Sequence, residues 1–225
     1  MPKFGKRDSS KPNKIFTLKK VNDKLAKIKY KFQDWNWNAS GTPLRLVNSR
    51  LNKRLIPQVE KLNRSKGPKV VVDWGCDNGK ALIEFAKKFP KVSFVGFSQE
   101  SHQDWVNVPK NITFLHTNTR AIEKLANKPS IKGRVGVLYS HYGLHHISKQ
   151  GGQAFVDHVL KLSAALKKGG KIIIRPGEFY DTHRSQIISP ENELVKILSK
   201  QFKPVFIQTP TIWGTKQALV ELIKK

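Results

Sequence analysis

The stretch Val70-Val71-Val72-Asp73-Trp74-Gly75-Cys76-Asp77-Asn78-Gly79 decides the fold. Its three consecutive valines, with no polar alternation, predict a strand that is buried on both faces, as in a parallel sheet. Gly75 and Gly79 allow a tight turn and a close approach of the backbone to a ligand. The next residues, Lys80–Phe89, have apolar side chains at helical spacing. A strand, a glycine turn and a helix in this order form a phosphate- and nucleotide-binding unit, whose ligand lies at the carboxyl end of the strand.

The rest of the chain alternates between predicted strands and helices, which predicts an α/β fold with a doubly wound sheet. The further strands are expected at Val92–Phe97, Ile112–Leu115, Val135–Ser140, Lys171–Arg175, Val205–Gln208 and Ala218–Ile223. Helices are expected at Leu44–Leu62, where Pro57 should bend or divide the helix, at Gln153–Leu166, and from Ser189 onward.

The pattern Asp-x-Gly-Cys-x-x-Gly at Asp73–Gly79 resembles the first motif of class I (Rossmann-like) S-adenosylmethionine-dependent methyltransferases, and the likeness extends over about residues 69–225. The resemblance implies a seven-stranded, mostly parallel sheet that binds S-adenosyl-L-methionine. It assigns the methionine half of this cofactor to Asp73 and to the turn that contains Gly75, Cys76, Asp77 and Gly79. Asp77 replaces a common glycine, and aspartate tolerates the left-handed backbone better than most residues. The alternative is an ordinary turn between a core strand and a core helix.

Two cofactor contacts of the family are changed in this chain. Ser98 stands where a carboxylate after the second strand usually binds the ribose, and Glu100 follows two residues later as a substitute. Asn118 stands where a second acid often contacts the adenine, and its carbonyl oxygen can still accept a hydrogen bond. These changes leave open a protein that has kept the methyltransferase fold but lost catalysis.

The segment Tyr139–Ser148 resembles the fourth motif of the family, in which a small or aromatic residue and Leu-His-His lie beside the methyl group. The resemblance assigns Ser140 to the cofactor and Tyr142, His145 and His146 to catalysis. Similar letters occur in cap guanine-N7 methyltransferases and in small-molecule carbon and oxygen methyltransferases. A histidine in this place is a candidate general base, and the alternative is a pair of histidines that caps the next helix.

The same segment disfavours three kinds of RNA methylation. A pyrimidine carbon requires a cysteine nucleophile near this strand, whereas the single cysteine is Cys76. The family's motif for exocyclic amines, Asn/Asp-Pro-Pro-aromatic, is missing, and Tyr139 and Ser140 cannot replace the aspartate that ribose 2′-oxygen methyltransferases use. A ring nitrogen such as guanine-N7 has a free lone pair, so positioning alone can suffice.

The charge of the chain predicts an RNA partner. The formal net charge is +26, and residues 1–33 alone contain 11 basic and 2 acidic residues. We expect residues 1–33 to be a basic, flexible arm, residues 34–68 to be a helical leader that packs on the core, and residues 69–225 to be the methyltransferase-like domain. The candidate contacts to RNA or substrate are Arg175, Arg184, Lys53 and Arg54. A lysine-rich surface that serves only solubility is the alternative.

Several classes are disfavoured by composition. The sequence contains no apolar run of the roughly 20 residues that span a bilayer, and no secretory signal, so we expect a cytoplasmic protein without a membrane partner. A mitochondrial or nuclear location stays open. One cysteine allows neither an intramolecular disulfide nor a multi-cysteine zinc site, and no metal is expected. An RNA methyltransferase is therefore the leading hypothesis; a small-molecule methyltransferase and a non-catalytic RNA- or ribosome-binding protein are the alternatives.

Overall fold

The computed structural model describes residues 41–99, 102–117, 119–141, 143, 152–175, 193–211 and 214–225. The expected basic arm at residues 1–33 lies outside the described residues. None of the helices in the described part of the chain is both long and apolar enough to cross a membrane.

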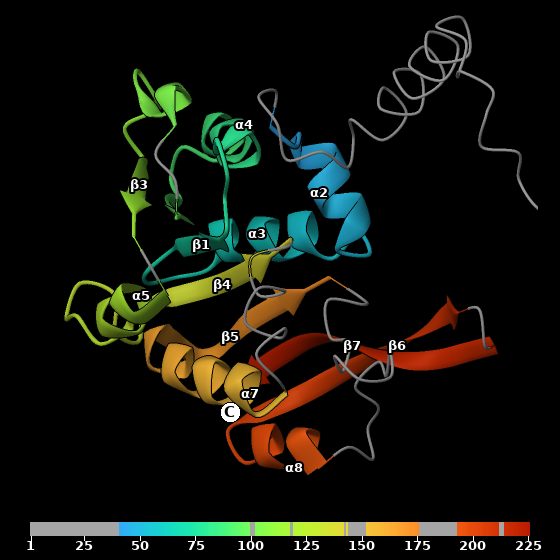
Figure 1. Cartoon of the computed structure of the whole chain (residues 1–225). Helices are drawn as coiled ribbons and strands as arrows, with labels where there is room; N and C mark the ends of the chain where they lie inside the picture. Colours follow the sequence, from blue (N-terminus) through green and yellow to red (C-terminus); the bar gives the residue numbers. More distant parts are fainter. Residues whose placement is uncertain are drawn as a thin grey trace, which may run out of the picture. The chain divides into compact units, whose positions relative to one another are not determined.

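Seven strands form one sheet in the order β3-β2-β1-β4-β5-β7-β6 (Figure 1). The strands are β1 (Val70–Trp74), β2 (Ser93–Ser98), β3 (Ile112–His116), β4 (Val135–Ser140), β5 (Leu166–Ile174), β6 (Phe202–Thr211) and β7 (Gly214–Lys224). Each pair formed among β1 to β5 is parallel, and β7 is antiparallel to both β5 and β6. The predicted doubly wound, mostly parallel sheet is confirmed. The carboxyl ends of β1 to β5 consequently meet at one edge of the sheet.

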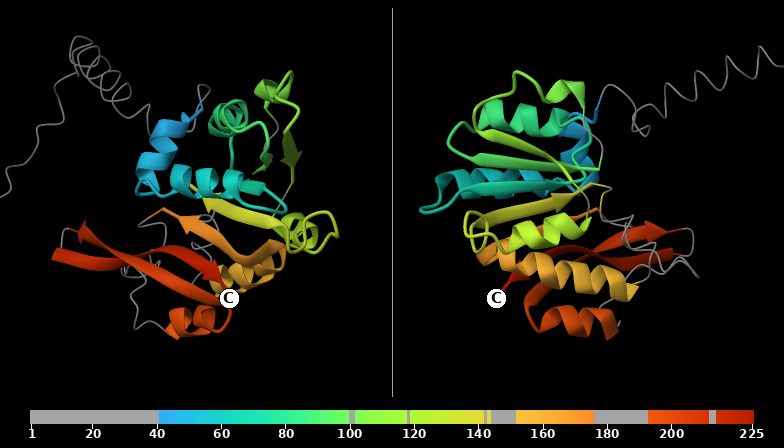
Figure 2. Two further views of the ribbon diagram at one scale, coloured as in Figure 1. Left: turned by 180° about the vertical axis from the view of Figure 1, so that it is seen from behind. Right: turned by 60° about the vertical axis from the view of Figure 1, so that its left-hand side comes forward.

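Helices cover both faces of this sheet (Figures 1 and 2). The helices α2 (Leu44–Arg50), α3 (Leu55–Arg64) and α4 (Lys80–Lys88) share one apolar cluster with side chains of the central strands. The helices α5 (Thr119–Ala126), α7 (Gly152–Leu162) and α8 (Glu193–Ser199) pack into a second cluster. Two short 3-10 turns, η1 (Gln103–Trp105) and η2 (Ser163–Ala165), complete the described elements.

Several element boundaries differ from the prediction, and β5, β6 and β7 are each longer than expected. The expected helix Gln153–Leu166 ends at Leu162, because Leu166 already pairs with Val135 in the sheet. The register between β4 and β5 then shifts, so that Lys171 pairs with Val137 and the intervening residues bulge out.

The helix expected at Leu44–Leu62 is divided, but before Pro57. Residues 51–54 separate α2 from α3, and Asn52 and Lys53 there have φ angles of 54° and 57°. A run of left-handed residues cannot continue a right-handed helix. Pro57 lies in the first turn of α3, where its missing N–H costs no helical hydrogen bond.

A buried carboxylate joins α3 to the sheet and corrects one of our assignments. Glu221 in β7 has a 1% exposed side chain and forms ion pairs with Arg54 and Lys171. The contact from Arg54 Nη1 to Glu221 Oε2 measures 2.7 Å. We predicted that Arg54 contacts RNA or substrate, whereas its guanidinium is paired with Glu221 of the sheet.

The ion pairs of Glu221 give the first testable prediction. Glu221→Gln should lower the free energy of unfolding by roughly 3 kcal/mol, because Arg54 and Lys171 lose their buried counter-charge. Urea denaturation measures the change. The matched control is Glu193→Gln, which removes an exposed carboxylate paired with Lys196 and should change the same quantity by less than about 0.5 kcal/mol. Equal urea midpoints for both variants would show that the buried ion pairs add no net stability.

Candidate functional site

The glycine turn between β1 and α4 forms the base of the site. The amide groups of Gly75 and Cys76 both donate to the carbonyl oxygen of Phe97 at the end of β2, at 3.0 and 2.8 Å. Gly75 has a φ of 82°, and a Cβ built there would lie 2.7 Å from the Cα of Gly143. Only glycine at position 75 therefore allows the turn after β1 to approach the segment after β4 this closely.

Asp73 supplies a buried carboxylate at this turn. Its side chain is 4% exposed, and the hydroxyl of Tyr139 donates to its Oδ2 at 2.7 Å. The parallel register places Asp73 beside Tyr139 on the neighbouring strand. Its other oxygen, Oδ1, is buried and has no hydrogen-bond partner among the residues that the structure describes. Burial raises the pKa of Asp73 to about 7, although the Tyr139 hydrogen bond acts in the opposite direction.

A buried carboxylate oxygen without a donor indicates a missing partner, because such an atom costs free energy until it is paired. An ammonium group, either directly or through water, would satisfy Oδ1 and favour the ionised form of Asp73. The amino group of S-adenosylmethionine is such a donor. The residues at the carboxyl end of β1 therefore fit the methionine half of this cofactor.

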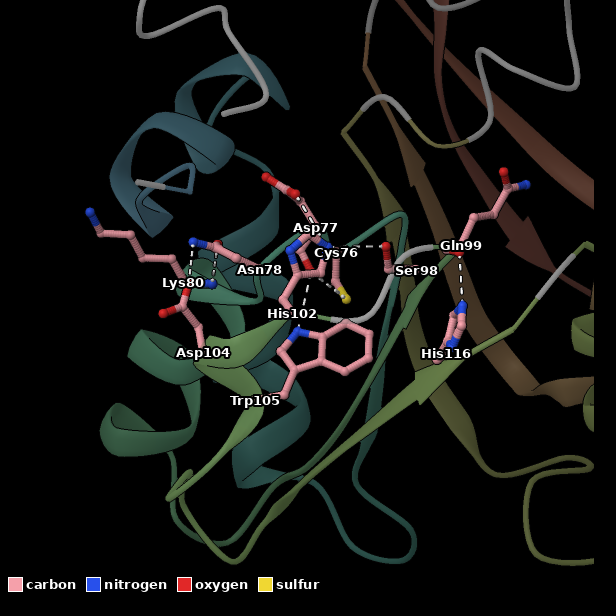
Figure 3. Close-up of polar contacts among 10 residues, drawn as sticks. All are labelled: Cys76, Asp77, Asn78, Lys80, Ser98, Gln99, His102, Asp104, Trp105 and His116. Carbon is pink, nitrogen blue, oxygen red and sulfur yellow. Dashed lines mark hydrogen bonds and ion pairs between the residues drawn. The ribbon is translucent and has the colours of Figure 1, made fainter. Parts of the chain in front are cut away.

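The loop after β2 folds against the same turn (Figure 3). Trp105 Nε1 donates to the carbonyl oxygen of Asp77 at 3.3 Å, and Asn78 Nδ2 donates to Asp104 at 3.0 Å. The indole of Trp105 stacks on Phe114 with an interplanar angle of 7°. Asp77 has a φ of 50°, as expected for an aspartate in the place of a glycine.

Ser98 lies at the end of β2, where we predicted it. Its Oγ is 3.5 Å from His102 Nε2, and the same nitrogen is 3.5 Å from Asp77 Oδ1 (Figure 3). A hydroxyl and an imidazole thus lie beside the glycine turn, and both can hydrogen-bond a hydroxyl group. The sequence reasoning missed His102, Asp104 and Trp105, because they follow the strand in a loop of irregular structure.

Two predicted cofactor residues are part of the packing. Cys76 is 8% exposed, and burial raises the pKa of its thiol, so it remains a small neutral side chain. Ser140 is fully buried at the end of β4 beside Trp74. Cys76 is part of the turn, and Ser140 lies next to it.

A histidine and two arginines occupy the carboxyl ends of β4 and β5. His141 is buried, and Arg50 from α2 lies beside it, with 3.2 Å between Nη1 and His141 Nε2. An arginine can only donate, so Nε2 accepts and the ring proton resides on Nδ1. Burial, and then the charges of Arg50 and Arg175, lower the pKa of His141 to about 3. His141 is therefore neutral near pH 7, with one lone pair already engaged.

The structure brings some of the remaining predicted residues to this edge and not others. Arg175 follows β5, and its charge helps to lower the pKa of His141. Lys53, in contrast, is exposed in the turn between α2 and α3. The predicted residues Tyr142, His145, His146, Glu100, Asn118 and Arg184 lie outside the described residues. Within the described part of the chain, no three His, Cys, Asp or Glu side chains are grouped as a metal would require.

Known proteins with this fold include methyltransferases. No family model and no curated protein sequence matches the chain. Magnesium protoporphyrin IX methyltransferase from Synechocystis PCC 6803, solved with bound SAM, superposes with a TM-score of 0.50 at 14% identity, over 97% of this chain and 100% of that chain. The plantazolicin methyltransferase BpumL, solved with SAH, gives 0.49 at 14% identity over 92% of this chain and 99% of its own.

An RNA-modifying enzyme is also among the similar structures. The 16S rRNA (adenine(1408)-N(1))-methyltransferase from Catenulisporales acidiphilia, solved as a mutant, gives a TM-score of 0.47 at 13% identity, over 75% of this chain and 90% of that chain. Together with the strand order β3-β2-β1-β4-β5-β7-β6, the superposition on the Synechocystis enzyme shows that this chain has the fold of the class I methyltransferases.

The raised pKa of Asp73 predicts a pH-dependent stability of the ligand-free protein. Between its ordinary pKa of 3.8 and its folded-state pKa of about 7, the folded protein binds the proton more tightly than the unfolded chain does. This contribution is therefore fully present below pH 3.8 and is lost as the pH rises through about 7. Its total is on the order of 4 kcal/mol.

Urea denaturation from pH 5 to pH 8 of the wild type and of Asp73→Asn measures this effect. The wild type should lose stability over this interval relative to the variant, whose amide does not titrate. Parallel pH profiles for the two proteins would contradict the assignment of a raised pKa to Asp73.

Proposed function

We propose that this protein is an S-adenosylmethionine-dependent methyltransferase that acts on RNA. The observation that carries the first half of the proposal is the unpaired, buried Oδ1 of Asp73 beside the glycine turn. A buried carboxylate with a raised pKa at the ligand-binding edge of an α/β sheet is typical of a functional site.

The residues of the chain divide the work of binding between two sides of the turn. Asp73 holds the amino group of the cofactor, and Gly75 and Gly143 let the turn after β1 pack closely against the segment after β4 beside it. Ser98 and His102 hydrogen-bond the ribose hydroxyls in the place of the usual carboxylate. The bound cofactor supplies a methyl group on a positively charged sulfur, which a lone pair can attack.

The described residues favour a nucleophile that needs no strong base. The lone pair on His141 Nε2 accepts from Arg50, and the lowered pKa of this histidine makes it a poor proton acceptor near pH 7. A ring nitrogen such as guanine-N7 attacks through a free lone pair and has no proton to lose, so positioning is enough. Tyr142, His145 and His146, which follow β4 in sequence, stay the predicted substrate-side residues.

Charge supports RNA as the substrate. The net charge of +26 attracts a polyanion. Arg50 and Arg175 both lie at the substrate edge, where a guanidinium group can form bidentate hydrogen bonds with a phosphate. Lys53 lies exposed in the turn that follows α2, the helix that carries Arg50. Arg184 stays a predicted contact of the same kind.

The cofactor half of the proposal is tested by calorimetric titration with S-adenosylmethionine. The wild type should bind, and Asp73→Asn should bind roughly 10- to 100-fold more weakly, because a charged hydrogen bond is lost. Glu60→Gln, which alters an exposed carboxylate on α3, is the control and should bind like the wild type.

The pH dependence of the same titration separates a direct role of Asp73 from a loss of folding. Binding of an ammonium group favours the ionised carboxylate, so affinity in the wild type should fall as the pH drops below about 7, and the variant should lack this dependence. No binding by the wild type would favour the non-catalytic alternative. Equal affinity of the wild type and Asp73→Asn for S-adenosylmethionine would show that the cofactor does not bind at the glycine turn.

The RNA half is tested by deletion of residues 1–33, which carry 11 basic and 2 acidic residues. The shortened protein should bind RNA of any sequence more weakly, with a shallower slope of log affinity against log salt concentration, because fewer phosphates are neutralised. Filter binding of both proteins at several salt concentrations measures this slope. Cofactor binding should stay unchanged. Equal slopes would show that the arm does not bind RNA, and feeble RNA binding by the full chain would favour a small-molecule substrate.

A further inference from the structure

The edge of the sheet opposite the cofactor turn is lined by basic residues. The amino ends of β1 to β5 meet there, because these strands are parallel, and β6 also begins there. The loops that precede β1, β2 and β3 contribute exposed Lys66, Lys91 and Lys110. Each of these lysines lies within four residues of the first residue of its strand.

The same edge continues across the other strands. The loop between α5 and β4 adds exposed Lys128, Lys132 and Arg134, and the bulge of β5 adds exposed Lys168. At the far end, Lys203 in β6 pairs with Ile223, and Lys225 donates its backbone N–H to Gln201.

These segments contain no acidic residue. The ranges 65–69, 89–92, 107–111, 127–134, 167–170, 200–203 and 224–225 include neither aspartate nor glutamate. Asp73, Asp77 and Asp104 all lie at the cofactor edge instead. Within these ranges the amino-end edge therefore carries basic groups without acidic ones, whereas the cofactor edge combines the three aspartates with Arg50 and Arg175.

Helix dipoles explain only part of this distribution. Basic side chains in the last turn of a helix are favoured by its dipole, which accounts for Arg64 in α3 and for Lys87 and Lys88 in α4. The dipole effect fades beyond the last turn, so it does not account for the lysines in the loops. The ion pairs within the described part of the chain involve none of Lys66, Lys91, Lys110, Lys132 or Lys168.

We propose that this amino-end edge is a second RNA-binding surface, which holds the phosphate backbone of the substrate RNA at a distance from the cofactor. The proposal rests on the proposed function only in taking RNA as the partner. Seven strands at about 4.8 Å spacing make an edge of roughly 29 Å, which is long enough to follow several phosphates. Lysines on separate loops contact phosphates without reading bases, so the surface fixes position and not sequence.

The test compares two triple variants of the full-length chain that remove the same charge. Lys91→Gln/Lys110→Gln/Lys132→Gln neutralises three loops of the edge. Arg45→Gln/Lys124→Gln/Lys196→Gln neutralises three exposed positions on α2, α5 and α8. Filter binding of a mixed-sequence single-stranded RNA from about 50 to 300 mM salt gives the affinity and its salt slope. Thermal unfolding and calorimetric binding of S-adenosylmethionine check that both variants are folded and keep the cofactor site.

The edge variant should bind RNA at least about tenfold more weakly at 100 mM salt, and its salt slope should fall by roughly two, at about 0.7 per lost phosphate contact. The control variant should change both quantities much less. Equal losses in the two variants would overturn the proposed surface and leave an RNA methyltransferase standing. If the edge variant keeps its affinity for RNA but no longer binds phosphatidylserine vesicles, the edge binds a lipid surface instead of RNA. If the wild type itself does not bind RNA, RNA is the wrong partner in both proposals.

Discussion

Parallel pairing of β1 with both of its neighbours is the constraint on which the rest of the structure depends. β1 lies between β2 and β4, and its register with both strands fixes where Asp73, Phe97 and Tyr139 meet. Because these parallel strands all point the same way, the loops that follow them lie at one edge of the sheet, and the loops that precede them lie at the other. The division between a cofactor edge and a basic edge follows from this geometry.

The sheet could be predicted from the sequence, because a buried parallel strand is a continuous apolar run that can be recognised locally. Val70–Val72, Val135–Ser140 and the glycine turn needed no tertiary information. The break between α2 and α3 was placed wrongly because proline is a visible signal, whereas the left-handed backbone at Asn52 and Lys53 is set by the packing around it. Proline in a first turn is compatible with a helix.

The site was predictable where it follows a strand and unpredictable where it depends on long-range contacts. Asp73 and Ser98 lie at strand ends, as the pattern indicated. The partner of Asp73, Tyr139, is 66 residues away, and the contact of Arg50 with His141 spans 91 residues. Neither pair leaves a local signal. Arg54 shows the converse. Its basic neighbours in the sequence suggested a contact with RNA, whereas its partner is Glu221, which is 167 residues away.

The buried carboxylate of Asp73, whose Oδ1 lacks a donor among the described residues, also bears on how the sequence would change if the ligand were no longer needed. The group weakens the empty fold at neutral pH, since burial opposes its ionisation. Substitution of Asp73 by an uncharged residue of similar size would then stabilise the folded protein, because residues that are kept for function commonly cost stability. A lineage that had become a passive scaffold would shed this aspartate early. Its presence here agrees with the proposed binding of S-adenosylmethionine at this turn.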